Sequence, residues 1–431
     1  MSKPRAKRIV ASLPLQSVAI VNPLGDFGIT TYSYELAEGL EANGVRVDFY
    51  TGNASPLSEL PARHHHRCFP VLGSLLLNQR RILQPPKDGG ERPGLRDQGD
   101  LPRTALWAVG DGAPTHPREG RFRNGLLGAE LALYLRSRGY DLVWTQWPDV
   151  YGTAFWSMGK ALGLRLAHTV HNVIPHDSSG EHVPQLRRVY SACDRLFVHS
   201  EQARRDFEAL FPELRDRLVV TPHGLYTIYP RCQQAGIRKR EELGFGDRQV
   251  VALVCGGIRP YKNVEAVVAA LADPQCAGAG LVVAGEESGY DDVSSSDPLA
   301  RTRRIATEAG VADRVRLIPR FLPSTELAEL VEAVDILALP YRKGFGSGLL
   351  LLGMTFGKHV LITDTGGAAE YLDGYPAHTL VQGITAPDVA TGLRRAMDSI
   401  GPRAALSIPR SPSLEWPAIA QRSIAELRNA R

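Results

Sequence analysis

The stretch SVAIVNPLGDFGITTYSYELAEGLEANGVRVDF, residues 17–49, decides the fold class. Its first five residues form a short, mostly apolar run typical of a buried strand, and a loop with two glycines follows. Residues 31–40 then repeat apolar side chains at helical spacing, Gly44 ends that helix, and residues 45–49 begin a second strand. The order of strand, glycine loop, helix and strand predicts a βαβ unit of a parallel sheet.

The same pattern continues through the first half of the chain. Further strand candidates lie at residues 141–144, 166–170 and 195–198. Helical spacing recurs near residues 128–137 and 201–210. Between 83 and 124 the pattern gives way to Pro, Gly, Arg and Asp, which we interpret as an irregular insertion. One doubly wound α/β domain is therefore predicted for residues 1–225.

A second series of apolar runs begins after a polar stretch near residues 225–245. Its strand candidates lie at residues 249–254, 281–284, 315–318, 336–339 and 360–363. Helical stretches separate them, so a second Rossmann-like domain is predicted for residues 226–410. The carboxyl ends of two such sheets face one cleft, where helix N-termini and glycine loops favour anionic ligands. This arrangement indicates a nucleotide or a phosphosugar.

Length and composition exclude several classes of protein. With 431 residues, 43% hydrophobic and 22% charged, the chain is expected to be globular, so fibrous and disordered classes are excluded. A net charge of +4 without a run of like charges indicates no nucleic-acid partner. Five scattered cysteines without a C-x-x-C pair indicate reduced thiols in the cytoplasm. No apolar run reaches the ~18–20 residues that a membrane helix needs.

The loop CGGIRPYKN at residues 255–263 is the most informative for chemistry. It leaves a predicted strand and enters a helix, and it places Arg259 and Lys262 where two cations can clamp a diphosphate. The alternative is a pair of solvated cations. The glycine pair, which includes Gly257, and the strand-to-helix context favour the clamp.

Two later glycine loops share this strand-to-helix context. In KGFGSG, residues 343–348, the backbone amides can cradle phosphate oxygens. In TDTGGAAE, residues 363–370, Glu370 falls in the first turn of a helix, where an acid also complements the helix dipole.

The order of these motifs resembles that of GT-B glycosyltransferases similar to glycosyltransferase family 4, over nearly the whole chain. In the first half the matches are Gly25 and Gly28 of the acceptor-side loop, His171 in HTVHN, VHSE at 198–201 and VTPHG at 220–224. In the second half the matches are Arg259 and Lys262, GKHV at 357–360 with His359 in place of proline, GGAAE at 366–370, and LEWPAIAQ at 414–421.

The resemblance implies a GT-B fold, in which two Rossmann-like domains face a cleft and a C-terminal helix, residues 411–431, packs back on the N-terminal domain. It implies an enzyme that moves a sugar from a nucleoside-diphosphate sugar to an acceptor hydroxyl, with the first domain facing the acceptor. The implied diphosphate contacts are Arg259, Lys262, Gly257, Ser347 and Gly348. The implied sugar or ribose contacts are Gly346 and Glu370, and the residues implied near the base are Arg320 and Phe321.

One departure from the family pattern concerns donor binding. The family usually carries Glu-x7-Glu, with one acid on the donor sugar and the other on the ribose, but Gly344 and Leu352 stand at those positions here. Charged hydrogen bonds are worth roughly 1.5–3 kcal/mol each, so donor binding must be rebuilt. Some GT-B enzymes use a Ser-Gly turn instead, so we interpret the change as a subgroup trait, with Ser347 and Gly348, or Glu370, as substitutes.

The resemblance also implies retention of anomeric configuration, for which the departing phosphate can itself take the acceptor proton. If the subgroup inverts instead, a first-domain base is needed, and Asp26 and His171 are the candidates. The chain contains no D-x-D pair, and three consecutive histidines at 64–66 cannot all face one ion from regular structure. We therefore expect no metal and no cofactor.

Two alternatives stay open. A GT-B-fold nucleotide-sugar epimerase would need paired acid and base residues in the cleft, and a non-catalytic partner subunit would have lost its chemistry with the two glutamates. The terminal tryptophan helix and G-G-x-x-E favour the transferase, and the intact Arg259 and Lys262 pair argues against a dead site. The expected acceptor is a small molecule, a glycan or a lipid-linked molecule, and the modest basicity allows weak association with an anionic membrane surface.

Overall fold

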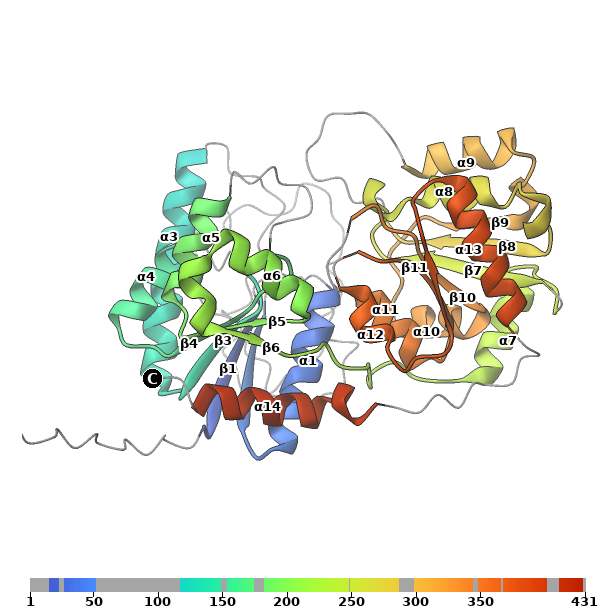
Figure 1. Cartoon of the computed structure of the whole chain (residues 1–431). Helices are drawn as coiled ribbons and strands as arrows, with labels where there is room; N and C mark the ends of the chain where they lie inside the picture. The colour runs from blue at the N-terminus through green and yellow to red at the C-terminus, as the bar shows by residue number, and fades with distance from the viewer. Residues whose placement is uncertain are drawn as a thin grey trace, which may run out of the picture.

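Two α/β domains lie side by side in this computed structural model (Figure 1). The structure describes residues 15–22, 27–51, 117–148, 153–173, 182–247, 249–286, 298–343, 348–365, 367–400 and 411–428. Within these ranges each domain has one six-stranded sheet, and the strand pairs of both sheets are parallel. The predicted fold class, two Rossmann-like domains, is confirmed.

The first-domain sheet consists of short strands that are mostly buried on both faces, as a parallel sheet covered by helices requires. Its strands are β1 (Ser17–Asn22), β2 (Arg46–Thr51), β3 (Leu142–Thr145), β4 (Leu166–Thr169), β5 (Arg195–Val198) and β6 (Leu218–Val220). Their order is β2-β1-β3-β4-β5-β6, so the strand order reverses between β1 and β3. Ligands of such sheets bind outside the carboxyl ends near that point.

Helices cover both faces of the first sheet. They are α1 (Phe27–Ala42), α3 (Pro117–Arg138), α4 (Ala154–Ala161), α5 (Val183–Ala192) and α6 (Glu201–Leu210). The start of α3 corrects the sequence analysis, because residues 117–124 are helical and not part of an irregular insertion. Pro117 occupies the first helical position, which proline favours because its missing N–H is not needed there. The rest of the expected insertion lies outside the described residues.

The second-domain sheet repeats the same construction. Its strands are β7 (Val250–Cys255), β8 (Ala279–Ala284), β9 (Val315–Ile318), β10 (Ile336–Leu339), β11 (His359–Thr363) and β12 (His378–Val381), in the order β12-β11-β10-β7-β8-β9. Its helices are α7 (Gln233–Glu242), α8 (Val264–Ala270), α9 (Pro298–Glu308), α10 (Ser324–Ala333), α11 (Gly348–Thr355), α12 (Ala368–Leu372) and α13 (Ala386–Ser399). Because α7 packs on α10, it belongs to the second domain, and the chain passes between the domains at about residues 221–232. We call residues 221–232 the crossing segment.

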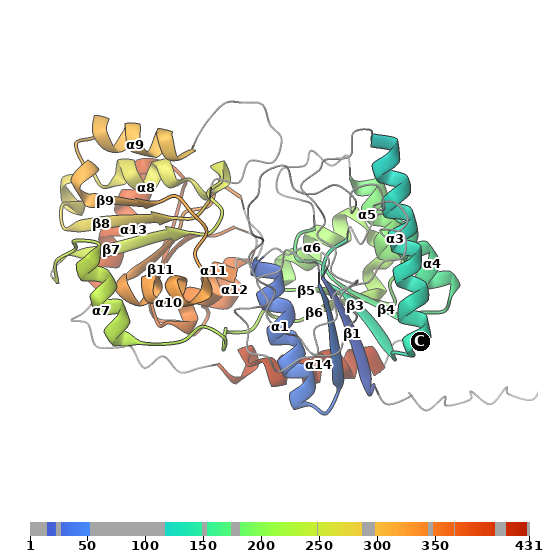
Figure 2. The same cartoon turned by 180° about the vertical axis from the view of Figure 1, so that it is seen from behind.

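The last helix, α14 (Trp416–Arg428), returns to the first domain and lies along α1 (Figure 2). Its apolar face shares a buried core with α1, β1 and β2. Gly39 of α1 makes room for it, since a Cβ there would lie 2.5 Å from the Trp416 carbonyl oxygen. The expected return of the C-terminal helix is confirmed.

The crossing segment forms hydrogen bonds with two parts of the first-domain side, the start of the C-terminal helical segment and α1. Leu225 donates its backbone N–H to the Leu414 carbonyl at 2.9 Å and accepts the indole N–H of Trp416 at 2.7 Å. Two residues on, Glu35 of α1 accepts the backbone N–H and the hydroxyl of Thr227 at 2.5 and 2.8 Å. Burial raises the pKa of Glu35 to about 7, although these hydrogen bonds oppose the shift. The first domain therefore fixes the start of the segment that leads to the second.

Within the described ranges, none of the helices is both long enough and apolar enough to cross a membrane.

Candidate functional site

The first-domain side of the site is a group of aromatic and histidine side chains at the carboxyl ends of β4, β5 and β6. His171, His199 and His223 follow these strands, and the ring of Tyr32 from α1 packs against all three, at centroid distances of 4.7, 5.0 and 5.1 Å. Trp416 lies 5.1 Å from Tyr32 and 5.6 Å from His223. We call these five residues the aromatic–histidine cluster.

Burial keeps the histidines of the cluster uncharged near neutral pH, because a buried imidazolium would lose its hydration. It lowers the pKa of His199 to about 4 and that of His223 to about 3. The pKa of His171 is also lowered well below its usual value, by burial and by its histidine neighbours. The first-domain side is therefore polar but neutral at this point.

His171 has a hydrogen-bond partner at each ring nitrogen. Its Nδ1 lies 3.4 Å from Nε2 of His199, and its Nε2 lies 3.2 Å from the side-chain oxygen of Gln146 at the end of β3. Nδ1 of His199 lies 3.1 Å from the carbonyl oxygen of Thr221. The nearby His168 lies within β4 and not after it, and its Nδ1 is 2.8 Å from the Thr145 hydroxyl oxygen. Burial lowers its pKa to about 3.

On the second-domain side, the loop between β7 and α8 carries the two predicted cations. The Lys262 side chain is buried, and its ammonium donates to the Cys255 carbonyl oxygen at 2.5 Å. Burial, with a smaller contribution from the charge of Arg259, lowers the pKa of Lys262 to about 8. The two cations are therefore close enough to repel each other, and an anion between them would relieve that repulsion.

The N-terminus of α11 converges on the same loop. A Cβ at Gly256, which has φ of 78°, would lie 3.0 Å from the Lys262 Nζ and 3.6 Å from Leu349 in the first turn of α11. At Gly348, the first residue of that helix, a Cβ would lie 2.5 Å from the hydroxyl of Tyr226. An ammonium group and a helix N-terminus thus meet where both favour an anion.

Glu370 links the second domain to the first domain. Its carboxylate accepts the backbone N–H groups of Glu201 and Gln202 at the N-terminus of α6, at 2.7 and 2.9 Å. The hydroxyl of the next residue, Tyr371, donates to the backbone carbonyl of His199 at 2.6 Å and accepts a hydrogen bond from the backbone N–H of His223 at 2.8 Å. The sequence-based expectation that Glu370 contacts the donor sugar or ribose stays a prediction.

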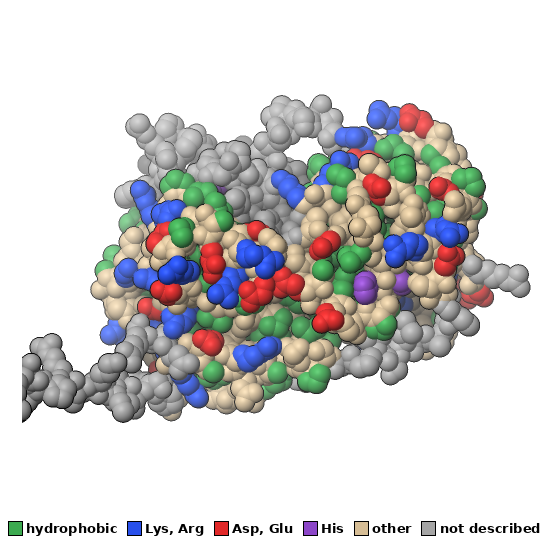
Figure 3. Space-filling view, in the orientation of Figure 1, with side chains coloured by type: hydrophobic (Ala, Val, Ile, Leu, Met, Phe, Trp, Pro, Cys, Tyr) green, Lys and Arg blue, Asp and Glu red, His purple; other side chains and the backbone are tan. Residues whose placement is uncertain are grey.

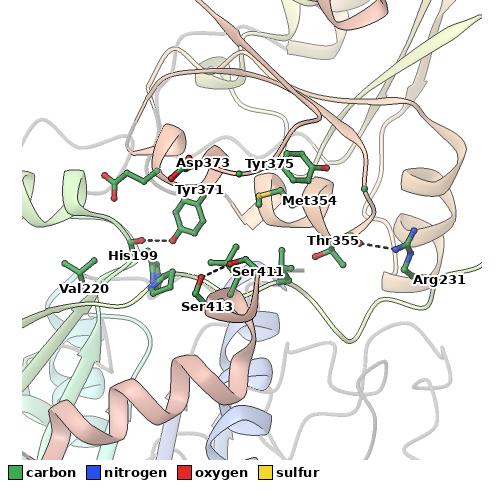
Figure 4. A pocket seen from close by; sticks show the side chains of 16 residues that line it. His199, Val220, Arg231, Met354, Thr355, Tyr371, Asp373, Tyr375, Ser411 and Ser413 are labelled. Atoms are coloured by element: carbon green, nitrogen blue, oxygen red, sulfur yellow. Dashed lines mark hydrogen bonds between the residues drawn. The ribbon is translucent and has the colours of Figure 1, made fainter. Parts of the chain in front are cut away.

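A cavity of about 420 Å³ lies between the domains, beside the crossing segment (Figure 4). Its lining includes His199, Tyr371, Thr355 and Ser411, and it includes none of the described residues that were expected to bind the diphosphate. Arg231 lines it too, but its guanidinium already bonds to Glu332 and to carbonyl oxygens of the α11 end. The cavity is therefore separate from the described residues expected to bind the diphosphate, but Glu370, which was expected to contact the donor sugar or ribose, lines it.

Comparison with known families agrees with this geometry. Residues 27–224 match the family described as "Glycosyl transferase 4-like domain", and residues 237–407 match "Glycosyl transferases group 1". The two matches cover the first and the second domain in turn. The chain belongs to the GT-B glycosyltransferases.

Curated relatives of this glycosyltransferase share about a quarter of its sequence. The D-inositol 3-phosphate glycosyltransferase of Corynebacterium jeikeium is 26% identical over 409 residues, which cover 89% of this chain and 87% of the relative. The protein of the same name from Kineococcus radiotolerans is 26% identical over 454 residues, with 98% and 95% covered.

Solved structures share the fold at lower identity. HepE of Anabaena, solved with UDP and glucose, aligns with a TM-score of 0.63 at 14% identity and covers 96% of this chain and 97% of its own. Sucrose-phosphate synthase of Thermosynechococcus elongatus aligns with a TM-score of 0.61 at 17% identity, covering 96% and 94%.

The structure of the glycosyltransferase brings some of the predicted site residues together. Arg259, Lys262 and Gly257 lie in the loop after β7, Gly348 begins α11, whose Leu349 side chain approaches that loop, and His171 lies in the aromatic–histidine cluster. Gly28 lies in the first turn of α1, where a Cβ would meet nothing within 4 Å. The predicted residues that lie outside the described ranges are Gly25, Asp26, Gly346 and Ser347.

Arg320 and Phe321 follow β9, the edge strand two places from β7. Arg320 forms an exposed ion pair with Glu326 at 2.5 Å, and Phe321 is 41% exposed. Their expected place near the donor base stays a prediction. Leu352, which stands where the family carries an acid, is buried in the apolar core under α11.

Sequence reasoning did not select Tyr32, His199, His223 or Gln146 as site residues. His199 and His223 fall inside the quoted motifs VHSE and VTPHG, so their position after consecutive strands was available as a signal. Tyr32 and Gln146 gave no such signal, because an aromatic residue on a helix and an amide after a strand occur at many ordinary positions.

Proposed function

We propose that this glycosyltransferase moves a sugar from a nucleoside-diphosphate sugar to an acceptor hydroxyl, with retention of anomeric configuration and without a metal ion. The observation that carries the proposal is the convergence of Arg259, Lys262 and the N-terminus of α11 on one loop. Two cations and a helix N-terminus match the charge of a departing diphosphate, and such groups act most strongly on charge that develops during the reaction.

Retention requires a balanced exchange on one face of the sugar. The bond between the anomeric carbon and the diphosphate oxygen breaks, the bond to the acceptor oxygen forms, and the acceptor proton passes to the departing diphosphate. No enzyme base is needed for this exchange, which suits a neutral His171 held for contact with sugar hydroxyls. If the reaction inverts instead, His171 is the described candidate for the base.

Metal independence is proposed because the protein supplies its own positive charge. In metal-dependent glycosyltransferases of the other large fold, a D-x-D pair binds the cation, and this sequence has no such pair. Within the described ranges, no three His, Cys, Asp or Glu side chains are grouped to hold an ion. Activity that disappears with a chelator and returns with manganese would contradict the proposal.

The first experiment is calorimetric titration of the full chain with UDP, GDP, dTDP, ADP and CDP. UDP is the first choice, because the solved neighbour HepE was determined with UDP and with UDP-glucose. Since a ligand of the folded state also raises thermal stability, a thermal-shift screen gives an independent reading. Binding of no nucleotide by either method would favour the non-catalytic alternative.

The acceptor is tested next, with the sugar of the nucleotide that binds. D-inositol 3-phosphate is tried first because the curated relatives carry it in their names, before glycan and lipid-linked acceptors. Proton NMR of the product reads the anomeric configuration directly, so an inverted product would refute retention. Release of a free epimerised sugar nucleotide without acceptor would instead support the epimerase.

The proposed partners are a sugar nucleotide and a small, glycan or lipid-linked acceptor, without nucleic acid. On the face shown in Figure 3, basic and acidic side chains are interspersed over α5 and α6. Arg204, for example, contacts both Glu201 and Glu208, at 3.6 and 2.9 Å. On this face, a mixed surface of this kind favours only weak association with an anionic membrane. We propose a cytoplasmic enzyme because the described cysteines are free thiols.

A further inference from the structure

Gln146 presents an unusual arrangement next to His171. It is completely buried at the carboxyl end of β3, and its side-chain nitrogen lacks a hydrogen-bond partner within the described residues. Its side-chain oxygen instead lies 3.2 Å from Nε2 of His171. A buried amide donor without a partner costs free energy, so this arrangement requires an explanation.

The protonation of His199 can be deduced from its surroundings. Its Nδ1 lies 3.1 Å from the carbonyl oxygen of Thr221, and a carbonyl can only accept a hydrogen bond. Nδ1 of His199 therefore carries the proton. Because a neutral imidazole has one N–H, Nε2 of His199 has a free lone pair and accepts.

The same reasoning extends to His171. Its Nδ1 lies 3.4 Å from the accepting Nε2 of His199, so a hydrogen bond between the two rings requires the proton on Nδ1 of His171. The other nitrogen of a neutral His171, Nε2, then has a lone pair. Tyr32 packs edge-on against the His171 ring at 4.7 Å and limits its rotation, while His223 and His168 are the other titratable groups close to it.

Two features of this arrangement are unfavourable: the Gln146 amide nitrogen has no partner within the described residues, and its amide oxygen faces the lone pair of His171 Nε2. Rotating the Gln146 amide through 180° removes both. Two lone pairs face each other when the Gln146 oxygen points to Nε2 of neutral His171. Amide oxygen and nitrogen positions are exchanged by rotating the side-chain amide through 180°. In the rotated form the amide nitrogen donates to Nε2, and the buried donor gains a partner. If His171 takes up a proton, rotation back gives Nε2–H a carbonyl acceptor.

We propose that His199 and Gln146 are positioning residues that together hold His171 in the Nδ1–H tautomer, with His199 accepting from Nδ1–H and the Gln146 amide donating to Nε2. The inference rests on the proposed function only for the role of His171 in transfer. It adds a hydrogen-bonded chain that runs from the Thr221 carbonyl through His199 and His171 to Gln146 and fixes which ring nitrogen of His171 carries the proton.

The direct test uses the full chain labelled with 15N-histidine. Two-bond proton–nitrogen NMR spectra distinguish protonated from unprotonated ring nitrogens, and the His171 signals are identified by their loss in His171→Asn. We expect His171 as the Nδ1–H tautomer in the wild type. His199→Phe keeps a ring beside Tyr32 but removes the acceptor, so His171 should become a mixture of tautomers. His199→Asn, whose side-chain oxygen accepts, should restore the single form.

Two observations would overturn the proposal. One is a wild-type His171 that carries its proton on Nε2, and the other is a tautomer that His199→Phe leaves unchanged in a folded protein. If His199→Phe does not fold, Gln146→Leu replaces it. There the tautomer should persist, but the His171 Nε2 signal should shift because its hydrogen-bond donor is gone, and an unshifted signal would contradict the arrangement.

Activity measurements separate this inference from the proposed function. His199→Phe should lower kcat roughly tenfold or more, as loss of a group that orients a catalytic imidazole does. In a His171→Ala background the same change should have no further effect, whereas additive losses would show that His199 acts independently. If His171→Ala leaves transfer unchanged while the NMR result holds, the role of His171 is refuted and the positioning is not.

Discussion

The two sides of the cleft differ in charge and in how the chain assembles them. The second-domain side places Arg259 and Lys262 in one loop next to a helix N-terminus. The first-domain side collects the aromatic–histidine cluster from two helices and three strand ends, and keeps its histidines neutral. The difference indicates a division of labour. In the proposed function, a short segment supplies the charge that meets the diphosphate, whereas the neutral surface proposed to orient the sugar depends on contacts between distant parts of the chain.

The largest effect is expected when both cationic side chains of the second-domain side are removed. Arg259→Ala combined with Lys262→Ala should weaken nucleotide binding roughly 100-fold or more, because each charged hydrogen bond is worth roughly 1.5–3 kcal/mol. Calorimetry with the best-binding nucleoside diphosphate measures it. Arg303→Ala combined with Arg394→Ala is the matched control in the same domain. Equal affinity in the wild type and the clamp variant would refute the site.

The next largest effect is expected when the indole that packs against the neutral first-domain side is removed. Trp416→Ala should lower the free energy of unfolding by about 3–5 kcal/mol, because the indole fills the space between Tyr32, His223 and Gly224. Urea denaturation measures the loss, with the exposed Leu133→Ala as control. Under conditions where the variant is folded, nucleotide affinity should stay within about threefold of the wild type. Loss of nucleotide binding by the folded variant would show that the two sides are not separable.

A smaller loss of stability is expected where the start of α11 in the second domain approaches Tyr226 of the crossing segment. Gly348→Ala should cost about 1–3 kcal/mol of stability, because the new methyl group would lie 2.5 Å from the Tyr226 hydroxyl. In a Tyr226→Phe background that oxygen is absent, so the cost should fall. Gly246→Ala is the control, since a Cβ there meets nothing within 4 Å. Equal costs in both backgrounds, measured by thermal unfolding, would contradict the close approach.

The smallest effect concerns Glu35, which ties the crossing segment to the first domain. Its pKa rises from 4.5 to about 7 on folding, so the folded state binds the proton more tightly. The stability this contributes is complete below pH 4.5 and is lost as the pH rises through about 7. Unfolding in urea should therefore show the wild type losing about 1 kcal/mol between pH 6 and pH 8 relative to Glu35→Gln. Parallel pH profiles of the two proteins would contradict this.

The sequence predicted the parts of the molecule whose signal is local. The apolar runs at β1 and β7 and the strand-to-helix loop with Arg259 and Lys262 each occupy a few consecutive residues, and the structure has them in the predicted places. The strand β6 escaped prediction because it has only three residues, all half-buried, which give no periodicity. Residues 117–124 escaped because charged and polar side chains there do not repeat at helical spacing.

The aromatic–histidine cluster could not be predicted, for a physical reason. Tyr32 and Trp416 lie far apart in the sequence, and their contact depends on α14 packing along α1. No periodic pattern in either helix encodes which partner it meets. Glu35 was missed in the same way, because its role depends on the crossing segment that passes beside α1.

The return of α14 to α1 also has a consequence for the order in which the protein can fold during synthesis. Trp416 reaches its partner Leu225 across 191 residues of chain. At a synthesis rate of about 5–20 residues per second, the ribosome needs about 10–40 s to make that stretch. During that interval the face of α1 around Leu36, Gly39 and Leu40 has no α14 to cover it. The domain that is synthesised first is therefore completed last.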